Sequence, residues 1–193
     1  MNNKIYWFTG QPGSGKTTMA NWMEAHLIHK VITIDGDDIR DVFQNKDYSE
    51  EGRRKNITNA QTLAKFLQHK GYNVVVSLVS PYKDQRDKFK AEMGDNLKEI
   101  YVHTNDIRGR EGFHVENYEA PTENFIDLDT TNQKEIETFK KSTIDPRAFV
   151  GKERDDNPIL AMRHQSAGNA LADLRSLAER DHVFLGFGFD NLE

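Results

Sequence analysis

Short apolar runs alternate with longer amphipathic segments along the first two thirds of the chain. The run at 72–79 is nearly continuous in valine and leucine, as in a strand that is covered on both faces of a parallel sheet. Together the apolar runs predict strands at 5–8, 31–34, 72–79, 100–102 and 125–128. Strands that alternate with helices predict an α/β fold with a central parallel sheet, whose ligands lie at the carboxyl ends of the strands.

The segments between these runs have helical spacing and recognisable helix ends. The first helix, which follows the first strand, is indicated by Met19, Ala20, Met23 and Leu27. Ser49 is a good N-cap for a second helix, which continues through the apolar positions of 57–67 and ends at Gly71. Ser80 and Pro81 begin another helix.

The chain changes character after about residue 144. The polar run 151–157 resembles a connector, and the apolar stripe of 167–178 predicts a helix that ends near Arg180 and packs on the sheet. The segment 183–189 alternates glycine with aromatic residues, so it fits either an edge strand in the core or a contact with a second subunit of a homodimer. We therefore divide the chain into a main domain, 1–143, and a C-terminal extension, 144–193.

Residues 10–17 read GQPGSGKT, a complete G-x-x-x-x-G-K-[ST] phosphate-binding loop between a predicted strand and a predicted helix. Glycines let backbone N–H groups turn toward a phosphate, and the helix adds the positive end of its dipole. Lys16 would reach the outer phosphates of ATP, and Thr17 would ligate Mg²⁺. The alternative is a chance glycine-rich turn. The predicted ATP-binding residues are Gly10, Gln11, Pro12, Gly13, Ser14, Gly15, Lys16, Thr17 and Thr18.

Composition limits the partners of such a site. A formal charge of −5 and a pI near 5.8 argue against general binding to nucleic acid or to an anionic membrane, so we expect small-molecule partners. The absence of cysteine excludes disulfides and thiolate metal sites and suits a reducing compartment. The first strand begins almost at once, which leaves no room for a signal peptide, and no apolar stretch is long enough to span a bilayer. We therefore expect a cytoplasmic location.

A phosphate-binding loop alone leaves GTPase, motor ATPase and kinase open. The sequence Asn45-Lys46-Asp47 is followed by Tyr48, so it is not a guanine-reading Asn-Lys-x-Asp motif, and the middle strand ends in 77–80 without an aspartate. Acids follow the second strand instead, at Asp35 and Asp37, where they could hold Mg²⁺ and orient or deprotonate an acceptor hydroxyl. An ordinary turn with helix-capping carboxylates is the alternative. We assign a catalytic role to Lys16, Asp35 and Asp37, and the metal to Thr17 and Asp35.

Cationic side chains gather near the same acids. Arginine forks match phosphate or sulfate oxygens in pairs, so Arg40 and Arg53 are the candidates for an anionic acceptor, while Arg54 and Lys55 are expected on the solvated surface. The histidines show no metal-ligand spacing, and no zinc site is expected.

These residues resemble the adenylylsulfate kinases, over roughly residues 3–140. The motifs that carry the resemblance are GQPGSGKTT, DGDDIR at 35–40, YSEEGRRKNI at 48–57, SPY at 80–82 and YEAP at 118–121. The resemblance implies a three-layer fold of nucleotide kinases and transfer of the ATP γ-phosphate to the 3′-hydroxyl of adenylyl sulfate. It also implies that Arg40, Arg53 and Asn56 bind the acceptor's anionic group and sugar, and that Tyr48 and Phe113 hold its base.

Ser80 lies where the family has a serine once proposed to carry a phosphoryl group. We expect it instead to cap the next helix or to contact the acceptor, because direct in-line transfer needs no covalent serine. Arg108 and Arg110, in the lid, either close over the transferred phosphoryl group or belong to a surface loop.

The chain departs from the family on the acceptor side. Residues 105–112 form a shorter lid, and Thr58 and Asn59 replace a usual pair of arginines. A related branch that resembles this pattern phosphorylates cytidine diphosphoramidate, which remains the alternative acceptor. A third interpretation is a nucleotide-binding regulatory subunit that has lost catalysis.

Overall fold

The computed structural model describes residues 3–27 and 30–143. The C-terminal extension 144–193, with its predicted helix ending near Arg180 and the segment 183–189, lies outside the described residues, as do 1–2 and 28–29.

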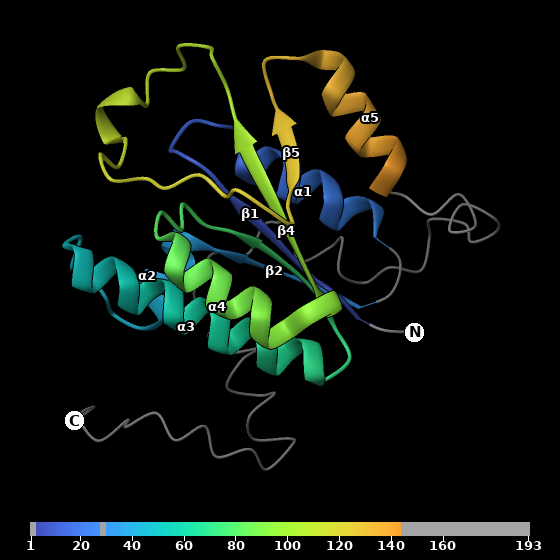
Figure 1. Ribbon diagram of the computed structural model, residues 1–193. Coiled ribbons are helices and arrows are strands. Elements are labelled where there is room, and N and C mark those ends of the chain that lie inside the picture. Colours follow the sequence, from blue (N-terminus) through green and yellow to red (C-terminus); the bar gives the residue numbers. More distant parts are fainter. Residues whose placement is uncertain (1–2, 28–29, 144–193) are drawn as a thin grey trace, which may run out of the picture. The chain divides into compact units, whose positions relative to one another are not determined.

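A parallel sheet of five strands forms the centre of the described domain (Figure 1). Its strands lie in the order β2-β3-β1-β4-β5, and every adjacent pair is parallel. The strands are β1 (Ile5–Thr9), β2 (Val31–Asp35), β3 (Asn73–Ser77), β4 (Leu97–His103) and β5 (Ile126–Asp129). Each coincides with a predicted apolar run to within a few residues, so the predicted α/β fold is confirmed.

Helices cover both faces of the sheet. Figure 1 shows α2, α3 and α4 gathered on one side and α1 and α5 on the other, which gives the expected three layers. The helices are α1 (Lys16–His26), α2 (Gly36–Val42), α3 (Glu50–His69), α4 (Lys83–Met93) and α5 (Gln133–Thr143), with short 3₁₀ turns η1 (Gly94–Asn96) and η2 (Glu111–Phe113). The helices α2 and α5 were not predicted. The helix α2 has only 7 residues, over which helical spacing is a weak signal, and α5 has a single buried side chain, Phe139.

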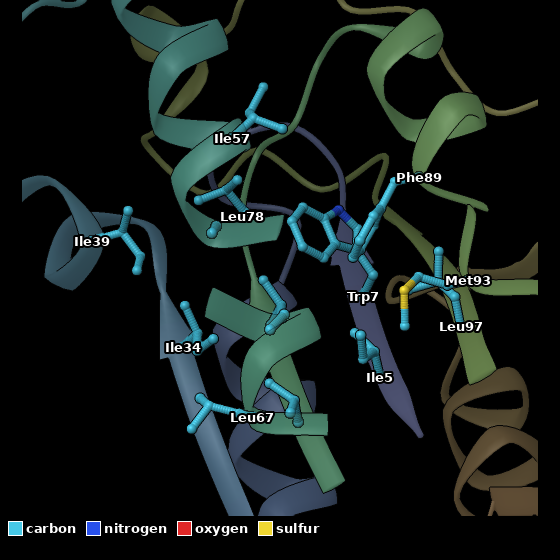
Figure 2. Close-up of a cluster of buried hydrophobic side chains, with 14 of the residues drawn as sticks. Ile5, Trp7, Ile34, Ile39, Ile57, Leu67, Leu78, Phe89, Met93 and Leu97 are labelled. Atoms are coloured by element: carbon cyan, nitrogen blue, oxygen red, sulfur yellow. The ribbon is translucent and has the colours of Figure 1, made fainter. Parts of the chain in front are cut away.

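The core has two halves because successive strand side chains point to opposite faces of the sheet. Under α3 and α4, Trp7 packs edge-on against Phe89 with ring centroids 5.4 Å apart, and Figure 2 shows both rings with Met93 and Leu97 beside them. On the opposite face, Phe8 lies in the second cluster. Val74 and Val76 belong to the first cluster and Val75 to the second, which explains why β3 reads as an uninterrupted apolar run.

Local signals placed most helix ends correctly, with one exception. Ser49 caps α3 as predicted, since its Oγ accepts a hydrogen bond of 3.2 Å from the Gly52 amide. The predicted capping role of Ser80 is wrong, because α4 begins at Lys83 with Tyr82 as its N-cap. Ser80 has a positive φ of 47°, and its carbonyl oxygen accepts a hydrogen bond of 2.6 Å from Arg86. Residues 80–82 therefore form a turn before α4 and are not part of the helix.

Candidate active site

The phosphate-binding loop joins β1 to α1 in the order that the motif requires. Gly13 and Gly15 have φ values of 83° and 96°, in the left-handed region that side chains disfavour. Gly10 also has no room for a side chain, because a Cβ there would lie 2.0 Å from the carbonyl oxygen of Val102. The glycine positions of the motif are therefore set by backbone conformation and by close approach to β4.

The carbonyl oxygens of residues 11–14 all have polar partners. The partner atoms are, in order, Lys16 Nζ at 2.8 Å, His114 Nε2 at 3.2 Å, Arg108 Nη1 at 3.4 Å and Thr130 Oγ1 at 2.8 Å. By contrast, the backbone N–H groups of Gly13, Gly15, Lys16 and Thr17 have no acceptor among the described residues. A run of free amides at the start of a helix is an anion-binding site.

Lys16 is unusual among lysines in being buried, with 8% of its surface exposed. Burial lowers the pKa of its ammonium group from 10.5 to about 8, although the negative charge of Asp35 acts in the opposite direction. A polyphosphate in the loop would supply negative charge next to this amine. An anion bound in the loop would therefore stabilise the charged form of the Lys16 amine.

Two oxygen groups that could hold Mg²⁺ meet beside the loop. Thr17 Oγ1 lies 3.4 Å from Asp35 Oδ2 and 3.1 Å from Ser77 Oγ. Asp35 and Ser77 are register partners at the ends of β2 and β3, so the sheet itself brings this pair to the loop. Within the described residues, no group of three acidic, histidine or cysteine side chains could form a metal cage. One hydroxyl and one carboxylate nevertheless fit Mg²⁺, which usually takes one or two protein oxygens with phosphates and water.

The acids after β2 have a structural role as well. Asp35 is the N-cap of α2, and its Oδ1 accepts a hydrogen bond of 3.0 Å from the Asp37 amide. Asp37 itself is exposed. Partial burial and the nearby charges of Asp35, Asp41 and Asp37 raise the pKa of Asp38. This crowding of negative charge favours a cation or a hydrogen-bond donor at this end of the sheet.

The predicted acceptor-binding cations differ in how far they are engaged. Arg40 Nη1 donates to the carbonyl oxygens of Asn45 and Asp47 at 3.1 and 2.8 Å, and its guanidinium lies 4.1 Å from the ring centre of Tyr48. Arg53 is half-buried on α3, and its guanidinium has no hydrogen bond or ion pair with any described residue. Among these two, Arg53 is the one available to an anionic ligand.

Two buried oxygens on the acceptor side lack partners. Asn56 donates through Nδ2 to the Gly36 carbonyl oxygen at 3.2 Å, whereas its Oδ1 has no hydrogen bond. Ser80 is 1% exposed and its Oγ is likewise unpaired. Buried polar atoms without partners are rare in folded proteins and often mark groups that bind a ligand.

The lid lies against the phosphate-binding loop. Arg108 donates to Thr130 Oγ1 and to the Thr130 carbonyl oxygen, both at 3.0 Å, besides its weak contact with the loop. Arg110 is close to Gly13, where an added Cβ would lie 2.9 Å from the arginine Cβ, and its guanidinium is 5.9 Å from the ring centre of Phe113. Phe113 and Tyr48 are exposed and their rings are not in contact with each other.

A buried charge network supports the turn that carries Ser80. Glu99 on β4 pairs with Arg86 Nε and Lys90 Nζ of α4, both at 2.7 Å, and the side chains of Arg86 and Glu99 are 2% and 1% exposed. Arg86 also donates to the carbonyl oxygens of Ser80 and Glu119. Sequence reasoning missed this network, although Arg86 stands three residues before the buried Phe89, a spacing that places it on the core face of α4.

Sequence reasoning also missed three contacts that frame the loop, because each joins residues that lie far apart in the chain. Thr130 Oγ1 donates to the Ser14 carbonyl oxygen, Gln11 pairs with Val115, and the Tyr118 hydroxyl lies 2.9 Å from Thr9 Oγ1. Among the helices of the described residues, none has the length and apolar character needed to cross a membrane.

Sequence comparison matches this chain to adenylyl-sulfate kinases. The family model described as adenylylsulphate kinase matches residues 2–124. The adenylyl-sulfate kinase of Buchnera aphidicola is 35% identical over 105 residues, which cover 52% of this chain and 51% of that protein. The enzyme of Lactiplantibacillus plantarum is 31% identical over 153 residues, which cover 67% of this chain and 73% of that protein. The chain thus spans about half the length of the Buchnera relative.

The fold is also that of solved kinases. The Mycobacterium tuberculosis APS kinase, in a complex with AMPPNP and APS, superimposes with a TM-score of 0.61 at 24% identity, over 74% of this chain and 97% of that chain.

Proposed function

Because this chain belongs to the adenylylsulfate kinase family, we propose that it transfers the γ-phosphate of ATP to the 3′-hydroxyl of adenylyl sulfate. One observation carries the proposal: the hydroxyl of Thr17 and the carboxylate of Asp35 lie 3.4 Å apart beside a loop in which four amides have no acceptor in the part of the chain that the structure describes. The donor phosphates and the acids that would face an acceptor therefore share one end of the sheet.

Each residue has a role that follows from its position. The loop amides and Lys16 would neutralise the phosphates, and transfer of a phosphoryl group depends chiefly on such positioning and charge. Thr17 and Asp35 would hold Mg²⁺, which when bound would stabilise the negative charge of the phosphates. Asp37, exposed at the start of α2, would orient the acceptor hydroxyl and accept its proton.

The acceptor would be held by the groups that the structure leaves without partners. Arg53 would bind its anionic group, and the unpaired oxygens of Asn56 and Ser80 are available to its sugar. Arg108 is suited to approach the transferred group, because it already contacts the Gly13 carbonyl oxygen. The absence of cysteine agrees with a cytoplasmic setting.

Cytidine diphosphoramidate remains the second candidate acceptor. Thr58, which stands where the family usually has an arginine, donates to the Arg54 carbonyl oxygen at 3.0 Å and accepts from Gln85 of α4 at 3.2 Å. A side chain engaged with α4 adds no cation to the acceptor pocket. The chain therefore offers less positive charge than its resemblance leads one to expect, and a different anionic nucleotide could fit.

Release of ADP in a coupled assay separates the three interpretations. The protein is supplied with Mg-ATP and either adenylyl sulfate or cytidine diphosphoramidate, and Lys16→Ala is compared with Lys88→Ala, a control at an exposed position of α4. We expect adenylyl sulfate to be the better acceptor and Lys16→Ala to lower the rate by about 10²- to 10³-fold. Faster turnover of the cytidine compound would favour the alternative acceptor, and nucleotide binding without turnover would favour a regulatory subunit.

A further inference from the structure

The side chain of Gln11 joins the phosphate-binding loop to a distant part of the chain. Its Nε2 donates to the Val115 carbonyl oxygen, and its Oε1 accepts from the Val115 amide, both at 2.9 Å. Val115 is 9% exposed, so water competes little for these bonds. The pair imitates one step of a β-ladder, with a side-chain amide in place of a strand.

Residues 113–118, which we call the return segment, follow the lid and contact the loop or the end of β1 through His114, Val115 and Tyr118. His114 Nε2 lies 3.2 Å from the Pro12 carbonyl oxygen, and Tyr118 is hydrogen-bonded to Thr9 at the end of β1. Gln11 lies between these contacts and makes the two shortest backbone-directed bonds of the group. The return segment begins at Phe113, the exposed aromatic residue on the acceptor side.

The chemistry of the contact explains why glutamine stands at this position. A primary amide side chain can donate to a carbonyl through its nitrogen and accept from an amide through its oxygen at once, and glutamine is longer than asparagine by one methylene group. The motif places no demand on this position, because its contacts to phosphate come from the backbone. The side chain is thus free to serve a second contact.

We propose that Gln11 is a positioning residue that couples the donor loop to the return segment, so that binding of ATP orders the residues that receive the acceptor. When the loop closes on phosphates, the paired amide carries Val115 and with it Phe113. The identity of the acceptor rests on the proposed function, whereas the coupling of nucleotide binding to the return segment does not.

Hydrogen exchange measured by mass spectrometry tests the coupling without turnover. Mg-AMPPNP should slow exchange of peptides that cover 113–118 in the unaltered protein, and Gln11→Met should abolish that effect. Methionine keeps the unbranched shape and removes both hydrogen bonds. The matched control is Gln68→Met, because Gln68 Nε2 also donates to a backbone oxygen at 2.9 Å, that of Asn3, far from the site.

Steady-state kinetics give the second readout. For Gln11→Met we expect the Michaelis constant of the acceptor to rise about tenfold, equal to about 1.4 kcal/mol, while the dissociation constant of AMPPNP measured without acceptor changes less than about twofold. Gln11→Glu keeps an acceptor for the Val115 amide but loses the donor to the Val115 carbonyl oxygen. Its Michaelis constant for the acceptor should therefore lie between those of the unaltered protein and of Gln11→Met.

Two results would overturn the proposal: AMPPNP protection of 113–118 in Gln11→Met equal to that of the unaltered protein, or a lower melting temperature with the acceptor's Michaelis constant unchanged. The second would give Gln11 a structural role alone. Protection that depends on Gln11, in a protein that turns over neither acceptor, would support the coupling and refute the proposed function.

Discussion

The buried ammonium group of Lys16 predicts that nucleotide binding takes up protons. In the empty loop, burial lowers its pKa to about 8 from 10.5, a difference worth about 3 kcal/mol. Polyphosphate next to Nζ favours the charged form and should return the pKa toward its ordinary value. Binding of Mg-AMPPNP should therefore take up about half a proton at pH 8, more near pH 9, and almost none near pH 7.

The same shift fixes the sign of a stability effect. The folded, empty protein holds this proton less tightly than the unfolded chain, so the penalty is complete below pH 8 and is relieved as the pH rises toward 10.5. The contribution of Lys16 to the free energy of unfolding should thus increase across that window. Saturating nucleotide should remove the dependence.

Isothermal calorimetry in two buffers with different ionisation enthalpies measures the proton count directly. Lys16→Met, which keeps the length of the side chain, should bind nucleotide more weakly and without this uptake, and Lys88→Met should behave like the unaltered protein. Uptake at pH 9 that persists in Lys16→Met would show that another group titrates. No uptake in the unaltered protein would mean that the amine is already charged in the empty loop.

Three further predictions concern the acids and the acceptor side. Asp37→Asn should leave ATP binding intact and lower kcat severely, because an amide cannot accept the proton; a loss confined to ATP affinity would instead place Asp37 in the metal site. Arg53→Ala should raise the acceptor's Michaelis constant by an amount equal to about 2 kcal/mol and spare that of ATP, and equal changes in both constants would refute this role. Glu99→Ala should lower the free energy of unfolding by about 3–5 kcal/mol in chemical denaturation, because it leaves the buried Arg86 unpaired; a loss below about 1 kcal/mol would contradict the burial.

Local pattern alone was sufficient for much of the fold. The strands could be predicted because a fully buried strand must be apolar along its length, as in Val74, Val75 and Val76. The start of α3 could be predicted because Ser49 accepts a hydrogen bond from the Gly52 amide, one of those that the first turn of a helix leaves free. The loop could be recognised because the local backbone conformation at Gly13 and Gly15 requires glycine.

Other features depend on contacts between residues far apart in the chain. Ser80 looks like an N-cap in its local sequence, yet a hydrogen bond from Arg86 holds its carbonyl oxygen and α4 begins three residues later. The difference between Arg40 and Arg53 is also tertiary, since only the folded chain shows which guanidinium already has partners.

The succession of strands, the phosphate-binding loop and the acids after β2 could be predicted from the chain alone, because each of them is marked by residues within a few positions of one another. The contacts of Asp35 with Thr17, of Glu99 with Arg86 in the core, and of Gln11 with Val115 could be seen only in the folded chain. Hydrogen bonds and ion pairs join whichever groups the packing of the sheet brings within about 3 Å of each other. No periodicity along the chain predicts which of these distant groups come into contact.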